Sequence, residues 1–177
     1  MRTVLTVDPG ADSGVALVCD DPVERQALGR LLGSWRVYGR RYRVWLHRAN
    51  AAVEEALECC EDVGVTIDDF AIEVPPSTAK RSSLKGDRRG MKSWLGLGQR
   101  IGAWQAVGHR YGLDARMVPV GVWTAALGPV GVRSKKVEGG KHRILEALRL
   151  VPGVPMIERV DVAEAALLGL AVARRIA

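Results

Sequence analysis

Short apolar runs rich in β-branched residues alternate along the chain with longer apolar stretches of helical period. The runs at residues 3–7 and 14–19 flank a segment of Asp, Pro, Gly and Ser, the composition of a tight turn, so they predict a β-hairpin. Further strands are predicted within residues 31–46 and over 67–74 and 115–120. Helical periodicity predicts helices over residues 49–63, 94–111, 122–126, 141–150 and 160–176.

The order of these elements predicts a single α/β domain over residues 1–177. Three strands, a helix, a strand, a helix, a strand and then helices make a mixed five-stranded sheet flanked by helices. A chain of 177 residues, 47% hydrophobic and 26% charged, suits one globular core. No apolar run approaches the roughly 20 residues of a membrane helix, so no membrane partner is predicted.

The three cysteines, Cys19, Cys59 and Cys60, are an odd number, and two of them are adjacent. That arrangement suits buried thiols in a reducing compartment better than a disulfide framework, and no Cys/His spacing indicates zinc. The N-terminal residues lack the long apolar core of a signal peptide. These features predict a cytoplasmic protein, in a bacterial cell or a phage-infected host.

The formal net charge of +6 is concentrated in two segments. Residues 77–92 sum to +5 and residues 133–143 to +4, which leaves −3 for the rest of the chain. Positive charge gathered in two loops of a slightly acidic body favours a polyanionic partner, although a basic run can also be a solvated surface. The candidate contacts with nucleic acid are Lys80, Arg81, Lys85, Arg88, Arg89, Lys92, Lys135 and Lys136.

Four acids stand in apolar surroundings, where carboxylates are costly to bury. Asp8 follows the first predicted strand and Glu73 interrupts the fourth. Asp161 and Glu164 lie three apart at the start of the last helix, on one helical face. Taken singly, Asp8 could be a turn residue, Glu73 a solvated edge acid, and Asp161 a helix N-cap with Glu164 as its capping partner. Taken together, the four acids predict a carboxylate cluster at one end of the sheet.

Clustered carboxylate oxygens are the ligands that Mg²⁺ prefers in proteins. Buried acids also need a positive partner. Two ions about 3.5–4 Å apart can activate a water and stabilise the leaving oxygen of a phosphodiester. The acids therefore predict a site for Mg²⁺ or Mn²⁺, with two ions and no small-molecule cofactor.

Four motifs together resemble the RuvC family of Holliday-junction resolvases, which have the RNase H-like fold. They are the Asp-Pro-Gly hairpin at Asp8, the Ala-Ile-Glu strand at Glu73, the Leu-Gly-Gln-Arg-Ile-Gly helix over 97–102 and the Asp-x-Ala-Glu-Ala helix at Asp161. Their order and spacing match over essentially the whole chain. The resemblance implies a metal-dependent endonuclease that cuts four-way DNA junctions as a symmetric homodimer. The implied catalytic metal ligands are Asp8, Glu73, Asp161 and Glu164, with Glu164 in place of the family's more usual Asp.

The resemblance also implies a catalytic lysine near the scissile phosphate. Lys141 is the best match, Lys135 or Lys136 are alternatives, and a solvated loop lysine is the plainer interpretation. A second lysine of the family is absent, because Trp123 occupies its approximate place.

Several relatives carry an aromatic residue soon after the strand acid, which wedges into the junction. This chain has Val74, Pro75 and Pro76 there. Junction opening would then use the basic loop over residues 77–93 or Trp94, or would work in a different way. Glycines at 96, 98, 102 and 108 predict close packing of the helix that follows, either within the monomer or across a dimer.

Three other functions use part of the same pattern. A nuclease for RNA–DNA hybrids or another structured nucleic acid would use the same four acids. A sugar-kinase or actin-like phosphotransferase also opens with an Asp-x-Gly hairpin, but it needs a second domain and a second phosphate-binding hairpin. A junction-binding protein without catalysis would have no need of all four acids.

Overall fold

The computed structural model describes residues 1–10, 12–21, 27–39, 41–74, 88–133, 141–152 and 159–175, with only the backbone given for residues 88–94 and Lys141. The strands are β1 (Thr3–Asp8), β2 (Ser13–Cys19), β3 (Arg30–Val37), β4 (Asp69–Val74) and β5 (Ala115–Pro119). The helices are α1 (Tyr42–Val63), α2 (Arg88–Arg110), α3 (Val120–Leu127), the short 3-10 helix η2 (Gly128–Val130), α4 (Lys141–Leu150) and α5 (Val160–Ala173).

The five strands form one mixed sheet in the order β3-β2-β1-β4-β5. β1 and β2 form the predicted antiparallel hairpin, and β3 continues it on the outer side of β2. β4 and β5 run parallel to β1, and each is reached through a helix that crosses over the sheet. The predicted α/β fold, a mixed five-stranded sheet flanked by helices, is therefore confirmed.

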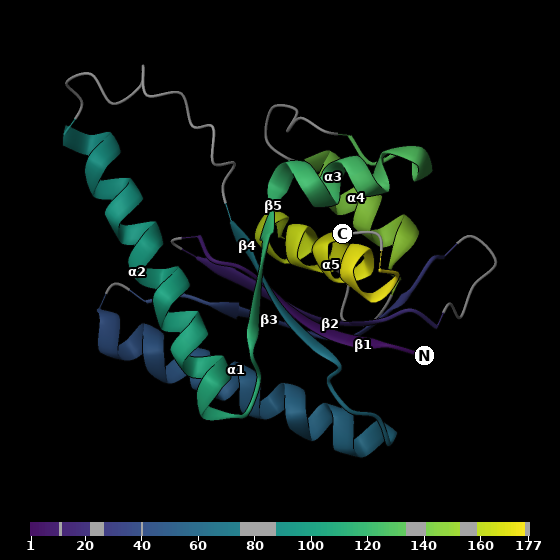
Figure 1. Cartoon of the computed structure of the whole chain (residues 1–177), viewed down its shortest axis with the longest axis horizontal. Coiled ribbons are helices and arrows are strands. Elements are labelled where there is room, and N and C mark those ends of the chain that lie inside the picture. The colour runs from purple at the N-terminus through teal and green to yellow at the C-terminus, as the bar shows by residue number, and fades with distance from the viewer. Residues whose placement is uncertain are drawn as a thin grey trace.

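The sheet is covered by helices on both faces (Figure 1). Alternate residues of a strand point to opposite faces, so each strand contributes to two cores. One core joins Val4, Ala16 and Ala71 of the sheet to α3, α4 and α5. The other core joins Leu5 and Ile72 to α1 and α2. Parity along β1 and β4 therefore decides which helices a given side chain faces.

α5 is apolar on all sides, as expected of a helix packed inside a protein. It lies directly on the sheet at Gly169, where a Cβ would come within 2.8 Å of the Val18 side chain. The Thr6 hydroxyl donates to the main-chain oxygen of Ala165 over 2.7 Å. This close packing fixes the start of α5 against the neighbouring ends of β1 and β2.

The region between β3 and α1 differs from its prediction. The strand ends at Val37 and the helix begins at Tyr42, seven residues before the predicted start at residue 49. Aromatic and β-branched residues in this segment favour a strand locally. Trp45 nevertheless continues the helical face of Ala49 and Ala52, all three buried, and tertiary packing overrides the local preference.

α2 also begins earlier than predicted, because residues 88–93 are helical rather than part of a basic loop. Its glycines fall into two groups. Gly108 packs closely, since a Cβ there would lie 2.4 Å from the Phe70 ring, whereas a Cβ at Gly98 or Gly102 would have no described atom within 4 Å. Close packing inside the monomer is thus confirmed only for Gly108.

Two further expectations can be compared with the structure. Cys19, Cys59 and Cys60 are all free thiols, with Cys19 and Cys60 buried. Burial raises the pKa of Cys60 to about 11, as expected of a thiol that packs in a core.

In the described ranges, none of the helices has both the length and the apolar character that crossing a bilayer requires.

Candidate functional site

Asp8 and Glu73 lie side by side at the carboxyl ends of two parallel strands. Val7 pairs with Ile72 in the register of β1 and β4, so Asp8 and Glu73 are the next residues in line. Asp8 is two residues from Thr6 and Glu73 two residues from Ala71, so both acids point to the same face of the sheet as Thr6 and Ala71, the face covered by α5. Asp8 is the last residue of β1 rather than part of the turn, and β4 is an inner strand rather than an edge. The turn and edge alternatives are therefore wrong for these two acids.

The start of α5 brings Asp161 to the same end of the sheet. Gly14 pairs with Asp8, and a Cβ at Gly14 would lie only 2.2 Å from the main-chain carbonyl of Asp161. No other residue type fits there, because any side chain would clash with the helix backbone. Gly14 thus sets how closely Asp161 approaches the strand that carries Asp8.

Asp161 is not a capping residue. The N-cap of α5 is Arg159, which makes no side-chain capping bond, so the capping-box alternative is wrong. The Asp161 side chain is 14% exposed, and its Oδ1 lies 3.6 Å from Nε of Arg159. Its other carboxylate oxygen is buried and has no hydrogen-bond partner within the described residues. A buried carboxylate oxygen without a donor is the kind of atom that a cation would satisfy.

Glu73 has a partner that the sequence did not reveal. The indole Nε1 of Trp123, from the start of α3, donates to Oε2 of Glu73 over 3.0 Å. Trp123 is fully buried in the core beneath α5. Trp123 therefore orients Glu73 through a neutral N–H donor.

Glu164 is held by a buried arginine. The Arg143 side chain, from α4, is 1% exposed, and its Nε lies 3.4 Å from Oε1 of Glu164. Arg143 Nη1 also donates to Glu146 over 3.1 Å, and the guanidinium group lies 5.1 Å from the centre of the Trp123 ring. Arg143 had been counted only as part of a basic segment. Its position shows a cation built into the carboxylate site.

A further arginine stands at the edge of the same site. Arg36 of β3 pairs with Gly14 and forms an ion pair with Asp12 of the hairpin turn. The hydrogen bond with Asp12 raises the pKa of Arg36, and the charge of Asp161 adds to that rise. Arg159 also approaches Asp12, at 3.6 Å. Asp12 thus forms ion pairs with two arginines at this edge of the site.

The donor set suits a hard divalent cation in its chemistry, since it offers carboxylate oxygens alone. The side chains are not arranged as ligands: within the described ranges, no three Asp, Glu, His or Cys side chains could hold a metal ion. Glu73 is bonded to Trp123 and Glu164 to Arg143. Metal binding at the site would therefore require these carboxylates to turn from their present partners.

The predicted basic residues are only partly placed. Arg88, Arg89 and Lys92 lie in the first two turns of α2, and Lys141 is the first residue of α4. α2 begins on the side of the sheet where β1 and β4 end (Figure 1). The residues outside the described ranges are Lys80, Arg81, Lys85, Lys135 and Lys136.

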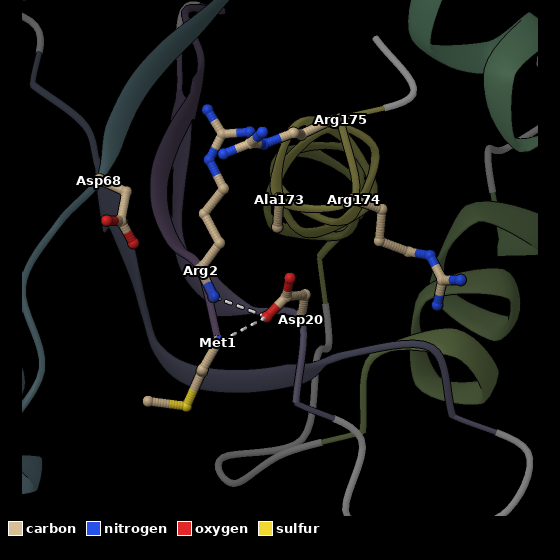
Figure 2. A pocket seen from close by; sticks show the side chains of 7 residues that line it. All are labelled: Met1, Arg2, Asp20, Asp68, Ala173, Arg174 and Arg175. Atoms are coloured by element: carbon tan, nitrogen blue, oxygen red, sulfur yellow. Dashed lines mark hydrogen bonds and ion pairs between the residues drawn. The ribbon is translucent and has the colours of Figure 1, made fainter.

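A cavity of about 360 Å³ lies at the opposite end of the sheet, beside the starts of β1 and β4 and the end of α5 (Figure 2). Its acids bind main-chain groups: Asp20 accepts from the amide of Arg2 over 2.6 Å, and Asp68 from the amide of Thr3 over 2.7 Å. Arg2 forms an ion pair with Asp69. These charges hold the strand ends together, which is a structural role.

Comparison with solved structures identifies the fold. The chain is similar to Thermus thermophilus RuvC in complex with a Holliday-junction substrate, with a TM-score of 0.65 and 16% identity over 96% of this chain and 92% of that one. A second structure of Thermus thermophilus RuvC matches over the same shares, with a TM-score of 0.63 and 16% identity. The chain has the RNase H-like fold of RuvC. No family model and no curated protein matches the sequence, so the likeness to RuvC is one of structure.

Proposed function

We propose that this protein is a structure-selective endodeoxyribonuclease that resolves four-way DNA junctions. The observation that carries the proposal is the meeting of Asp8, Glu73 and Asp161 on one face, at the carboxyl ends of β1 and β4. The fold is that of RuvC, one structure of which holds a Holliday-junction substrate. A fold alone does not determine function, so the proposal depends on this site.

Asp8, Glu73 and Asp161 would hold the metal, Mg²⁺ or Mn²⁺, as carboxylate ligands. The bound metal would supply an activated water and neutralise charge on the phosphate. Trp123 keeps Glu73 in place through its indole N–H. Glu164 is the fourth proposed ligand, but a second ion would have to compete with Arg143 for it. Lys141, at the start of α4, is the proposed contact with the scissile phosphate.

The proposal includes a homodimer, in which two sites cut opposing strands of the junction. α2 offers a face for a second copy: Leu95 is 62% exposed, and Gly98 and Gly102 lie on the same helical face. Small residues let two helices approach closely. The glycines that pack against nothing in the described monomer are thus the proposed dimer contact.

The experiment compares three substrates. Four-way DNA, an RNA–DNA hybrid and linear duplex DNA are incubated with the protein, with and without Mg²⁺ or Mn²⁺. We expect paired nicks at symmetric positions of the four-way DNA, only with metal, and little cutting of linear duplex. Preferential cutting of the hybrid would replace the proposal with a hybrid nuclease, and metal-independent binding without any cutting would indicate a junction-binding protein.

A further inference from the structure

The end of β3 and the start of α1 carry a group of arginines and tyrosines, most of which are exposed. This arginine–tyrosine surface consists of Arg36, Tyr38, Arg41, Tyr42, Arg43 and Arg48. Residues 36–53 contain five arginines and no acid. No acid stands in the first turn of α1, and its N-cap Arg41 makes no side-chain capping bond. Cations at the positive end of a helix dipole reduce the stability of the helix, so the charges of Arg41 and Arg43 do not stabilise α1.

The aromatic rings of the arginine–tyrosine surface are held ready for contact. Tyr42 is 60% exposed and stacks by one face on Trp45, with ring centres 6.1 Å apart and planes at 18°. Trp45 in turn packs edge-on against the buried Trp104 at 5.4 Å. Tyr38 is 45% exposed, with the guanidinium groups of Arg48 and Arg36 at 3.9 and 4.9 Å from its ring centre. An aromatic ring fixed on one side and exposed to solvent is a platform for a nucleobase.

A cavity of about 160 Å³ opens beside Tyr42 and is also lined by Trp45, Gln99 and Arg100. Water occupies about 30 Å³ per molecule, so the space suits one flat ring system rather than a whole nucleotide. Gln99 and Arg100 offer hydrogen-bond donors, and Gln99 an acceptor. The buried indole N–H of Trp45 has no acceptor among the described residues. The lining therefore combines aromatic rings, which can stack on a base, with polar groups that can form hydrogen bonds to it.

The arginine–tyrosine surface adjoins the carboxylate site. Gly14 pairs with Asp8 on one side and with Arg36 on the other, which separates Asp8 and Arg36 by two strand spacings, or roughly 10 Å. α1 begins at the end of the sheet where β1 and β4 finish (Figure 1). A nucleic-acid strand at Asp8 can thus continue onto the arginines.

We infer that the start of α1 binds an unpaired segment of DNA, with one base stacked on Tyr42 and the neighbouring phosphates on the arginines. The inference rests on the proposed nuclease function and adds to it a contact for a strand opened from its duplex. Stacking is tolerant of sequence because every base has a flat π-face, so the surface holds the strand without reading it. The arginines supply the salt-dependent share of the affinity.

The test is binding of a fluorescent oligothymidylate to the full chain in EDTA, where no cutting occurs. Tyr42→Ala is expected to weaken binding about 5- to 150-fold, the usual range for one stacked base. Two control variants are expected to bind within about twofold of the unsubstituted protein. Tyr42→Phe keeps the aromatic ring, and Val44→Ala changes a neighbouring side chain that is 43% exposed. A thermal unfolding curve for each variant checks that the fold is kept.

The inference is overturned if Tyr42→Ala binds the oligothymidylate as the unsubstituted protein does, or if Tyr42→Phe loses as much affinity as Tyr42→Ala. A 2-aminopurine placed at the junction crossover gives a second measurement, because stacking on Tyr42 quenches its fluorescence and Tyr42→Ala should restore it. Neither measurement needs catalysis. A protein that binds the oligothymidylate through Tyr42 and cuts no junction would refute the proposed nuclease and leave this surface standing.

Discussion

The two ends of the sheet both gather charged side chains, but they use them differently. At the carboxylate end, defined by Asp8, Glu73, Asp161 and Glu164, one oxygen of Asp161 is buried without a hydrogen-bond partner in the described structure. At the arginine end, defined by Arg2, Asp20, Asp68, Arg174 and Arg175, the acids accept hydrogen bonds from main-chain amides of β1. Clustered charge alone therefore does not identify a reactive site.

The difference lies in what the fold gains from each group. Asp20 and Asp68 satisfy amides that would otherwise have no partner at the start of a strand, which stabilises the fold. Asp161 and Glu164 instead lie largely buried near the start of the apolar helix α5, where removing a carboxylate from water costs free energy. A protein that keeps such groups needs them for something other than folding, and a metal-dependent reaction is the use proposed above.

The largest expected effect is on junction cutting. Three substitutions keep the shape of a side chain and remove its carboxylate charge: Asp8→Asn, Glu73→Gln and Asp161→Asn. Each should lower the rate of cutting by more than about 100-fold, because losing a metal ligand costs more than losing a residue that only supports a ligand. Junction binding should persist. Asp20→Asn at the arginine end is the matched control and should cut at the normal rate. Normal cutting by one of the three variants would remove that residue from the site.

Arg143 tests whether the carboxylate end contains its own cation. Arg143→Ala leaves Glu146 and Glu164 buried without their guanidinium partner, so the free energy of unfolding in urea should fall by about 3–5 kcal/mol. Arg36→Ala breaks the ion pair with Asp12, whose two side chains are 36% and 41% exposed. This substitution should change the free energy of unfolding by less than about 1 kcal/mol. Equal losses in the two variants would contradict the buried network.

The dimer can be tested on α2. Gly98→Arg places a long charged side chain on the proposed contact, and should convert a dimer into a monomer in sedimentation velocity. Gly98→Ala keeps the residue small, so the dimer should survive. The unsubstituted protein should be a dimer at assay concentrations. If it is a monomer at every such concentration, even with junction DNA present, that result would count against a symmetric resolvase.

The smallest expected effect concerns the basic segment before and at the start of α2. Replacing Lys80, Arg81, Lys85, Arg88 and Arg89 with alanine should weaken junction binding and flatten its salt dependence, by up to about 0.9 in the log–log slope for each lost phosphate contact. Cutting at saturating protein should survive better than binding, because the carboxylates are intact. Unchanged affinity and salt slope would show that this segment is only a solvated insertion.

Much of the fold could be read from the sequence, because the signals were local. The two apolar runs at residues 3–7 and 14–19 predicted the hairpin, and the largely apolar α5 was placed to within three residues of its end. The start of α1 was missed because Tyr42 and Trp45 are aromatic residues, which favour strands locally. Only the packing of Trp45 against Trp104 distinguishes the two.

The partners of the acids could not be predicted, because they come from distant parts of the chain. Trp123 is 50 residues from Glu73, and Arg143 lies one helix before Glu164. A tryptophan in place of a lysine looked like a lost charge, but the structure shows an indole donor on Glu73. The grouping of the arginines of residues 36–48 with Tyr38 and Tyr42 is visible only in three dimensions.

The central claim is that the carboxylate end binds a divalent cation and the arginine end does not. Mn²⁺ binding, measured by electron paramagnetic resonance on the full chain with saturating junction DNA on ice, tests it most directly. The unsubstituted protein and Asp20→Asn should bind Mn²⁺ equally, while Asp8→Asn should lose at least about tenfold in affinity. Undiminished Mn²⁺ binding by Asp8→Asn, or a loss caused by Asp20→Asn, would contradict the account.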